Sequence, residues 1–458
     1  MSGRLILHRW LRSLPLAAAA LFFGAAAGAD DPAGRNAPEL RQKVDRLLAE
    51  LDAETRSERT AARESLLALG PAILPLLPDE RSVASAATRD AVRQIRTRLE
   101  RQSALATLAA SRVTLHGRFP LREMLSRIAA ETGNQFDCAA IDPSVLGREF
   151  PVADQSRAFW SACDDLIQKA GLAYAPIHKP GSLKLLPAAL VGSNRELAVA
   201  ESGPFRVAVL SAALRPALDE SRKLLRISWS VLGEPRLRPL FASIAASRLV
   251  VMWSESTGSR STMFKPATPT AKWELEMGEG AHLLRLDSDF EVPAGAEPAT
   301  VEFRGSLNVE MAAGPQRLVF DDLSSTRRET RRAGSVTVGL RSVEFSPPGE
   351  KHGAVRIEIG LVYDQGGPAF ESYRTWMYHN EAALETNSGR RIAPRPLVST
   401  RQQGDGSVAV EYNFADVEGT PRDYRFVYVA PTLITQVPVE FRFPKIPVAR
   451  AASKGAKR

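Results

Sequence analysis

Residues 112–187 constrain the fold more than any other stretch, because their pattern switches between strand and helix periods. An apolar run at 113–115 precedes residues spaced to share one helix face: Leu121, Met124, Leu125 and Ile128. Pro120 and Gly133 stand where such a helix begins and ends. Two strand-like segments follow, then a second amphipathic helix that Ser156 can cap and Gly171 ends, and then a hairpin. The pattern predicts the order strand, helix, strand, strand, helix, strand, strand.

Four motifs in this stretch carry a family resemblance. They are Phe-Pro-Leu-Arg-Glu-Met-Leu at 119–125, Glu-Thr-Gly-Asn at 131–134, Ile-Asp-Pro-Ser-Val-Leu-Gly at 141–147 and Lys-Ala-Gly-Leu-Ala-Tyr at 169–174. The segment resembles the short N-terminal (STN) domain shared by secretins and TonB-dependent receptors. The resemblance implies a small α+β domain at 111–190 that contacts other proteins in the periplasm and performs no catalysis.

The first 29 residues have the composition of a secretory signal. Three arginines, Arg4, Arg9 and Arg12, precede an apolar stretch at 14–27, and small residues end it at Ala29. We therefore expect a Sec-type signal cleaved after Ala29, a periplasmic or secreted protein, and no transmembrane span after cleavage. A membrane anchor fits less well, because a spanning helix needs about 20 apolar residues.

The net charge of +8 overstates how basic the folded protein is. The signal removes three arginines, and four basic residues lie in the tail at 448–458, which we expect to be disordered. About one positive charge then remains on the body. Together with the lack of a basic helix, this argues against nucleic-acid binding.

Residues 39–110 have a helical period. One stripe comprises Leu40, Val44, Leu47, Leu48 and Leu51. The string at 62–77, with Gly70-Pro71 in its middle, resembles one HEAT-type unit, and a third helix is expected from Ser82 to about Leu108. A single unit cannot form a solenoid, since repeats need neighbours to bury their faces. The sequence predicts a small helical hairpin region.

From residue 203 onward the helical period gives way to strand-like alternation with frequent Pro and Gly. Residues 301–320 align without a gap on 424–443, which places Phe303 on Phe426 and Phe320 on Phe443. This predicts two tandem antiparallel β-sandwiches of the Ig-like type, at 203–333 and 334–447. The alternative is that two β-rich stretches align by chance. The fold class expected for the whole chain is α+β multidomain.

The two cysteines form the first candidate site. Cys138 shares strand parity with Phe136, and Cys163 shares a helix face with Phe159, so both are expected to face the core of the 111–190 domain. A disulfide between Cys138 and Cys163 would stabilise the fold by roughly 3 kcal/mol. The alternative is two buried free thiols, and an apolar setting makes a nucleophilic cysteine improbable for either.

No pattern in the sequence indicates a catalytic centre, a bound metal or a cofactor. The six histidines are scattered, and no phosphate loop, nucleophile elbow or dinucleotide motif is present. The densest aromatic cluster, at 370–380, offers a possible surface for sugars or a partner: Tyr373, Trp376 and Tyr378. The alternative for these three is ordinary cross-strand packing.

These features favour an exported, non-enzymatic protein of the cell envelope that acts as a protein-protein interaction adaptor. Envelope proteins are the expected partners. One alternative is a carbohydrate-binding envelope protein that recognises polysaccharide. Another is a hydrolase whose site is assembled from scattered residues, since fold alone does not exclude catalysis.

Overall fold

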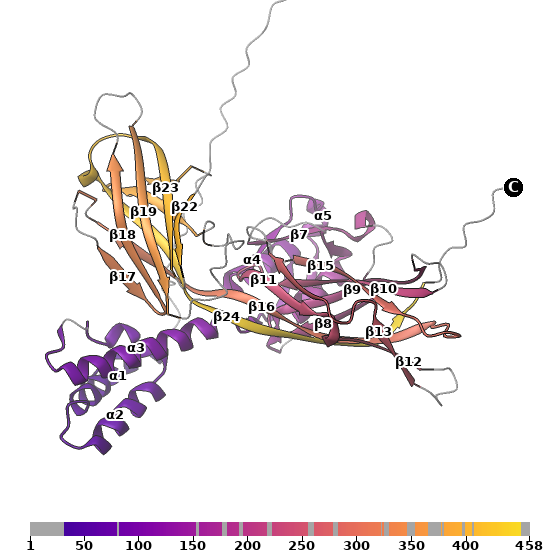
Figure 1. Cartoon of the computed structure of the whole chain (residues 1–458), viewed down its shortest axis with the longest axis horizontal. Coiled ribbons are helices and arrows are strands. Elements are labelled where there is room, and N and C mark those ends of the chain that lie inside the picture. The colour runs from indigo at the N-terminus through magenta and orange to yellow at the C-terminus, as the bar shows by residue number, and fades with distance from the viewer. Residues whose placement is uncertain are drawn as a thin grey trace, which may run out of the picture. The chain divides into compact units, whose positions relative to one another are not determined.

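The computed structural model (Figure 1) describes residues 32–79, 82–152, 155–175, 181–191, 196–217, 222–254, 261–277, 283–321, 323–324, 329–345, 353–364, 377, 380–395, 399–404 and 407–449. Strands account for 50% and helices for 27% of the structure, so the fold is mainly β-sheet with few helices. The expected signal at 1–29 lies outside the described residues.

The N-terminal helices differ from the sequence prediction in two places. The chain divides into two compact units after Leu66, and α1 (Pro32–Glu50) and most of α2 (Arg56–Ala68) belong to the first. The expected apolar helix after Gly70 is a short 3₁₀ turn, η1 (Pro71–Leu76), which contains a second proline. Helix α3 (Ala86–Ala106) begins later than Ser82, because Ser85 caps it by accepting a hydrogen bond from the Thr88 N–H.

Between residues 112 and 187, two main helices and one short helix pack among three small sheets. Gly133 and Gly171, both with positive φ, end the main helices. Strands β1 and β5 pair, β2 and β4 pair, and β7 lies between β3 and β6. The elements are β1 (Arg112–Val113), β2 (Gly117–Pro120), α4 (Leu121–Thr132), β3 (Gln135–Asp137), α5 (Pro143–Leu146), β4 (Glu149–Val152), β5 (Arg157–Ala158), α6 (Phe159–Ala170), β6 (Leu172–Tyr174) and β7 (Ser182–Pro187).

A twelve-stranded sheet follows the short turn η3 (Ala188–Val191). Its main path runs β21-β20-β24-β16-β12-β13-β15-β10-β9-β8, and β11 pairs with both β16 and β14. The strands are β8 (Ala198–Ser202), β9 (Phe205–Pro216), β10 (Lys223–Gly233), β11 (Arg238–Ala245), β12 (Leu249–Ser254), β13 (Ser261–Pro266), β14 (Lys272–Glu276), β15 (Leu283–Glu291), β16 (Thr300–Phe320), β20 (Ala382–Thr386), β21 (Arg391–Ile392) and β24 (Tyr424–Pro447).

A five-stranded antiparallel sheet covers the far ends of the two longest strands. Its order is β17-β18-β19-β23-β22, and its buried side chains join those of β16, β20 and β24 in one core. The strands are β17 (Thr330–Ala333), β18 (Val336–Phe345), β19 (Gly353–Tyr363), β22 (Ser399–Gly404) and β23 (Ser407–Val417), and the short turn η7 (Pro421–Asp423) leads into β24.

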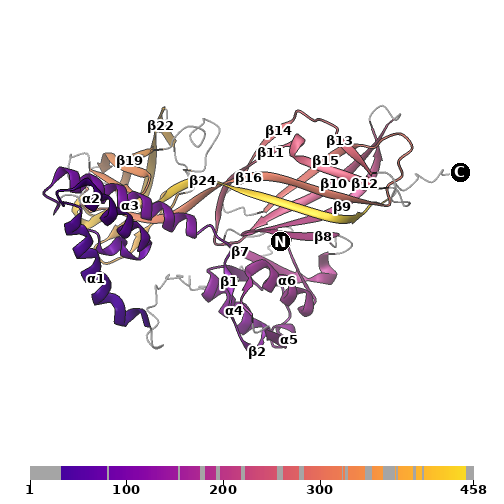
Figure 2. The same cartoon turned by 90° about the horizontal axis from the view of Figure 1, so that it is seen from below.

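Strands β16 and β24 form one long antiparallel ribbon that serves both β cores (Figure 2). Phe303 and Phe443, at one end, belong to the core built on β9, β10 and β15. Phe320 and Phe426, at the other end, belong to the core of the five-stranded sheet. The boundary expected between 333 and 334 therefore does not separate the two cores. The last part of β24 lies after that boundary but belongs to the core built on β9, β10 and β15.

The two segments that align in sequence are partners in this ribbon. Phe303 pairs with Phe443 and Phe320 pairs with Phe426, so the aligned residues exchange places across the ribbon. Both pairs bring their rings close, with centroids 6.3 Å and 6.1 Å apart. The sequence similarity therefore places similar residues at the two ends of a single ribbon. It does not mark two strands in equivalent positions of separate domains.

The C-terminal tail is ordered two residues further than expected. Val448 and Ala449 were expected to be disordered, yet the Ala449 N–H donates to the Ala212 carbonyl at 2.8 Å and its carbonyl accepts from the Leu214 N–H at 3.1 Å. The expected disordered tail at 450–458 lies outside the described residues.

Glu385, on β20, supports a pH-dependent prediction. Burial alone would raise its pKa, but hydrogen bonds and charge from Arg317 and Arg425 outweigh burial and hold the pKa below its usual range. Because the pKa of Glu385 is lower in the folded than in the unfolded protein, its ionised form stabilises the fold at pH values above the unfolded pKa. This stabilisation is lost as the pH falls through the folded pKa. We expect Glu385→Gln to be less stable at pH 7 and to lose less stability between about pH 5 and pH 3. Urea unfolding across this range measures the difference. Equal slopes for both proteins would contradict the prediction.

Candidate functional site

The two cysteines are not joined in the structure. Both are free thiols, Cys163 buried and Cys138 partly exposed. The strand that the sequence extends through residue 140 ends at Asp137, so Cys138 lies in a turn where its carbonyl accepts from the Ile141 N–H. Both side chains still meet the same core, as expected, Cys163 within it and Cys138 packed against it, but no bridge joins them. Burial raises the pKa of Cys163 well above its ordinary value, which makes this thiol inert.

The aromatic candidates Tyr373, Trp376 and Tyr378 lie outside the described residues. Met377, which the structure does describe, is 2% exposed and packs in the core of the five-stranded sheet. Within the described ranges, no group of three or more His, Cys, Asp or Glu side chains is placed to hold a metal ion.

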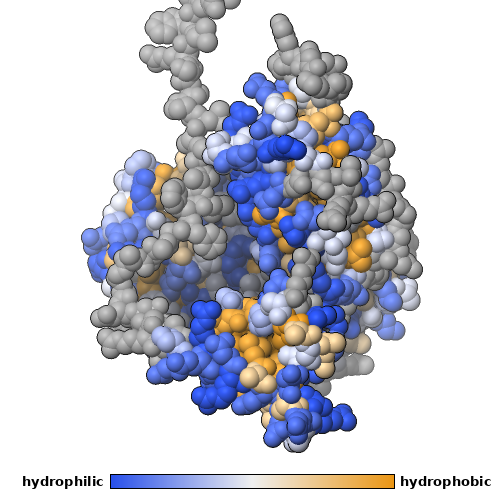
Figure 3. All heavy atoms as spheres, turned by 90° about the vertical axis from the view of Figure 1, so that its left-hand side faces the viewer, coloured by the Kyte–Doolittle hydropathy of each residue, from blue (hydrophilic) through white to orange (hydrophobic). Residues whose placement is uncertain are grey.

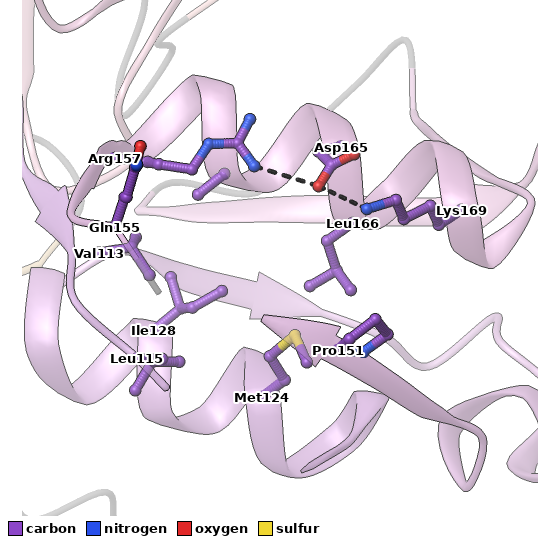
Figure 4. Close-up of a pocket in the computed structure, with 11 residues that line it drawn as sticks. Val113, Leu115, Met124, Ile128, Pro151, Gln155, Arg157, Asp165, Leu166 and Lys169 are labelled. Carbon is purple, nitrogen blue, oxygen red and sulfur yellow. Dashed lines mark hydrogen bonds and ion pairs between the residues drawn. The ribbon is translucent and has the colours of Figure 1, made fainter. Parts of the chain in front are cut away.

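A groove on the 112–187 domain is the first candidate binding site. It lies between α4 and α6, beside β1 and β4, and is shallow, with a cavity volume of about 30 Å³ that is open to solvent (Figure 4). Leu166 on α6 and Met124 on α4 point toward one another across it. The apolar lining comprises Val113, Leu115, Met124, Ile128, Pro151, Ala162 and Leu166.

Charged side chains from β5 and α6 form one rim of the groove. The Asp165 carboxylate accepts from Arg157 at 3.1 Å and from Lys169 at 2.9 Å. Burial opposes ionisation of Asp165, but these two cations outweigh it and lower its pKa. The rim therefore carries two positive charges and one negative charge beside an apolar floor.

Glu234 forms a buried polar node behind this domain. It follows β10 and is 0% exposed, and its carboxylate accepts from the Ser111 N–H at 2.9 Å and the Ser111 hydroxyl at 2.6 Å. Asn134 Nδ2 donates to it at 3.1 Å and Arg236 Nε at 2.7 Å. Arg236 also donates to the carbonyls of Thr107 and Ala109. This node joins the end of α3, the 112–187 domain and the large sheet.

Arg206, on β9, forms a second buried node. Its guanidinium donates to Asp164 at 2.9 Å and to both oxygens of Glu196 at 2.7 and 2.6 Å, and it lies 4.9 Å from the ring centre of Tyr174. Burial raises the pKa of Asp164, although Arg206 opposes the shift. Burial also raises the pKa of Tyr174, whose hydroxyl donates to Asp164 at 2.9 Å. A network this well satisfied fixes α6 against β9.

Apolar packing joins the same two parts. Leu232 of β10 is buried in the core of the 112–187 domain, and Leu283 packs against that core. The indole N–H of Trp160 donates to the Pro204 carbonyl at 3.0 Å. The domain that carries the groove is therefore fixed to the large sheet. The attachment is not visible in the sequence, where Glu234-Pro235-Arg236 has the pattern of a rigid connection.

The remaining exposed hydrophobic residues are spread along the chain. Figure 3 shows one face, where hydrophobic residues gather in a limited area among hydrophilic ones. Large exposed hydrophobics occur from Leu105 on α3 to Val362 on β19, and Trp273 on β14, 37% exposed, is the one aromatic residue among those described. None of them lines the groove between α4 and α6.

No described helix is both long enough and apolar enough to cross a membrane. No protein-family model matches the chain, and no curated protein is similar to it. The groove and the two polar nodes are therefore interpreted from their own chemistry.

Proposed function

We propose that this chain is an exported, non-enzymatic adaptor of the cell envelope that binds a partner protein through the groove between α4 and α6. The proposal includes a secretory signal cleaved after Ala29, a periplasmic or secreted location, and an STN-like role for residues 111–190. The observation that carries it is the groove itself, which pairs an apolar floor with a charged rim. Such a surface suits a peptide segment that lays apolar side chains over the shallow floor and places charges at the edge.

The attachment of the 112–187 domain to the large sheet supports the same proposal. Glu234 and Arg206 tie it to the large sheet through buried charges, and these charges stay satisfied only while the parts remain together. A fixed groove loses little conformational entropy when a partner binds. The adaptor would thus hold its partner at a defined position relative to the β-sheets.

A substitution inside the groove tests this function. Ala162 lies on α6, is half-buried and lines the groove. We expect Ala162→Arg to weaken capture of the partner at least about tenfold, because a long charged side chain would fill the apolar floor. The measurement is quantitative affinity capture from envelope extracts with the tagged mature chain, followed by identification of the captured protein.

The matched control is Ser126→Arg, which adds the same side chain at an exposed position of α4 outside the groove. Circular dichroism of both variants shows whether they fold. Unchanged capture by a folded Ala162→Arg protein would refute the groove as the binding site. Turnover of a glycoside or peptide by the purified chain would refute the non-enzymatic part of the proposal.

A further inference from the structure

Strand β14 forms an edge of the large sheet (Figure 2). Strands β11 and β12 are joined by the short turn η4 (Ala246–Arg248) and both pair with β16, and β14 pairs with β11. Among the described strands, none pairs with the other side of β14. An edge strand offers its outward N–H and C=O groups to a further strand, so this side of β14 is a candidate interaction surface.

The hydrogen bonding to β11 shows which residues of β14 face the open edge. The Met277 N–H donates to the Leu240 carbonyl at 2.8 Å. In an antiparallel pair, the N–H and C=O of one residue point to one neighbour, and those of the next residue point to the other side. The odd-numbered residues of β14 therefore face β11. The N–H and C=O groups of Lys272 and Glu274 point to the open edge.

The side chains of β14 are divided between the two faces of the sheet. Trp273 pairs with Ile244 of β11, so both lie on the face that covers the core of the large sheet. Ile244 is 3% exposed, whereas Trp273 is 37% exposed. Successive side chains alternate between faces, which places Lys272 and Glu274 together on the opposite face. The edge therefore carries an accessible indole on one face and two charges on the other.

The two charged side chains of this edge have opposite signs. Lys272 and Glu274 are both exposed. No hydrogen bond or ion pair of the Lys272 side chain is found in the part of the chain that the structure describes. Glu274 has an interaction of its own, and a carboxylate can accept several donors. An edge with a cation and an anion two residues apart is complementary to a second edge of the same sequence in antiparallel orientation.

We infer that two copies of this chain associate through β14, which pairs antiparallel with β14 of the other copy so that the two Trp273 residues lie opposite each other. In this register Lys272 of each copy lies opposite Glu274 of the other, so the same charge pair occurs twice, as a two-fold interface requires. These residues face the open edge and form the hydrogen-bonded pairs, and the two indoles form the closer, non-hydrogen-bonded pair.

Charge selects this register over its neighbours. The two adjacent registers that keep the same hydrogen-bonding residues place Glu274 opposite Glu274 or Lys272 opposite Lys272, and like charges directly opposite each other are destabilising. The edge is therefore complementary to itself in one register, which favours a second copy over an unrelated strand. Because β14 has only five residues, the dimer is expected to be weak and dependent on concentration.

The pairing does not depend on the proposed adaptor function, because β14 and the groove between α4 and α6 share no residue. It would nevertheless affect that function. A dimer carries two grooves, so a partner with two binding segments would be held more tightly than by one copy.

Sedimentation velocity of the mature chain over a wide range of concentrations tests the proposal. We expect a monomer–dimer equilibrium. Lys272→Glu and Glu274→Lys should each weaken self-association about tenfold or more, because both cross-strand pairs then bring like charges together. A mixture of these two variants should associate, since each carries the charges that the other lacks. The double variant Lys272→Glu/Glu274→Lys should associate with itself as the original chain does.

Two further variants complete the experiment. Trp273→Ala should weaken association, because it removes the aromatic pair. Lys445→Glu reverses the same charge at an exposed position of β24 and should leave association unchanged. Circular dichroism shows whether each variant folds. A chain that stays monomeric at all concentrations, folded single variants that associate as the original does, or a double variant that fails to associate would each overturn the proposal. Ala162→Arg should not alter the dimer, so a failure of either function is recognised separately.

Discussion

Glu234→Ala is expected to lower the free energy of unfolding by about 3–5 kcal/mol, because removing one member of a buried charge pair leaves the other uncompensated. The carboxylate is fully buried, and four donor groups from Ser111, Asn134 and Arg236 converge on it. Without it, Arg236 keeps a positive charge in a largely buried site. Asn134, itself 0% exposed, loses one of the two acceptors of its side-chain amide and keeps Ser111 Oγ.

The effect should extend beyond local stability. Ser111 ends the connection from α3 into the 112–187 domain, and Asn134 follows α4 within that domain. Loss of Glu234 therefore weakens the attachment of the domain to the large sheet. Amide hydrogen exchange should speed up in both parts near this node, since local opening becomes less costly.

Urea unfolding followed by circular dichroism measures the change. Arg442→Ala provides the comparison, because it removes a salt bridge from Glu302 whose arginine is 65% exposed. An exposed pair of this kind contributes about 0–1 kcal/mol. If Glu234→Ala and Arg442→Ala destabilise the chain equally, the node does not hold the domain in place. Glu234→Gln, which keeps the shape but removes the charge, should fall between them.

Helices were predictable from the sequence where apolar residues recur on one helix face. The stripe of Leu121, Met124, Leu125 and Ile128 is buried in α4 as expected, and Met124 and Ile128 also line the groove. The 3.6-residue period makes this face visible within about two turns of helix. The other wall of the groove comes from α6, so its existence depends on tertiary packing.

Strand pairing over long distances was not predictable. Alternation identifies inward and outward faces in 301–320 and 424–443, but it does not say which strand is the neighbour. The structure pairs these two segments with each other over their whole length. The division into two sandwiches therefore fails at β24, whose Phe426 and Phe443 lie in different cores. The role of Glu234 was not predictable either, because burial of this loop carboxylate depends on residues 123 and 100 positions away.

Gly314→Ala is expected to destabilise the chain by about 2–5 kcal/mol, through backbone strain and overpacking together. Gly314 lies near the middle of β16 with φ of 60°, a conformation that an L side chain adopts at a cost of roughly 1–2 kcal/mol. An added Cβ would also meet the Thr432 hydroxyl and would lie 2.9 Å from the Ala104 Cβ of α3. The ribbon and α3 can approach this closely because the position has no side chain.

Gly203→Ala separates the two causes. Gly203 has φ of 56°, but an added Cβ there would meet nothing within 4 Å. Gly203→Ala should therefore lower the free energy of unfolding through backbone strain alone. Any further loss of stability in Gly314→Ala should come from the clash with Thr432 and with Ala104 of α3. Ala104→Gly in the Gly314→Ala background should recover part of the loss, since it removes one of the clashing atoms, and a double-mutant cycle measures this coupling. Equal destabilisation by Gly203→Ala and Gly314→Ala, with no recovery from Ala104→Gly, would show that α3 does not pack against the ribbon at Gly314.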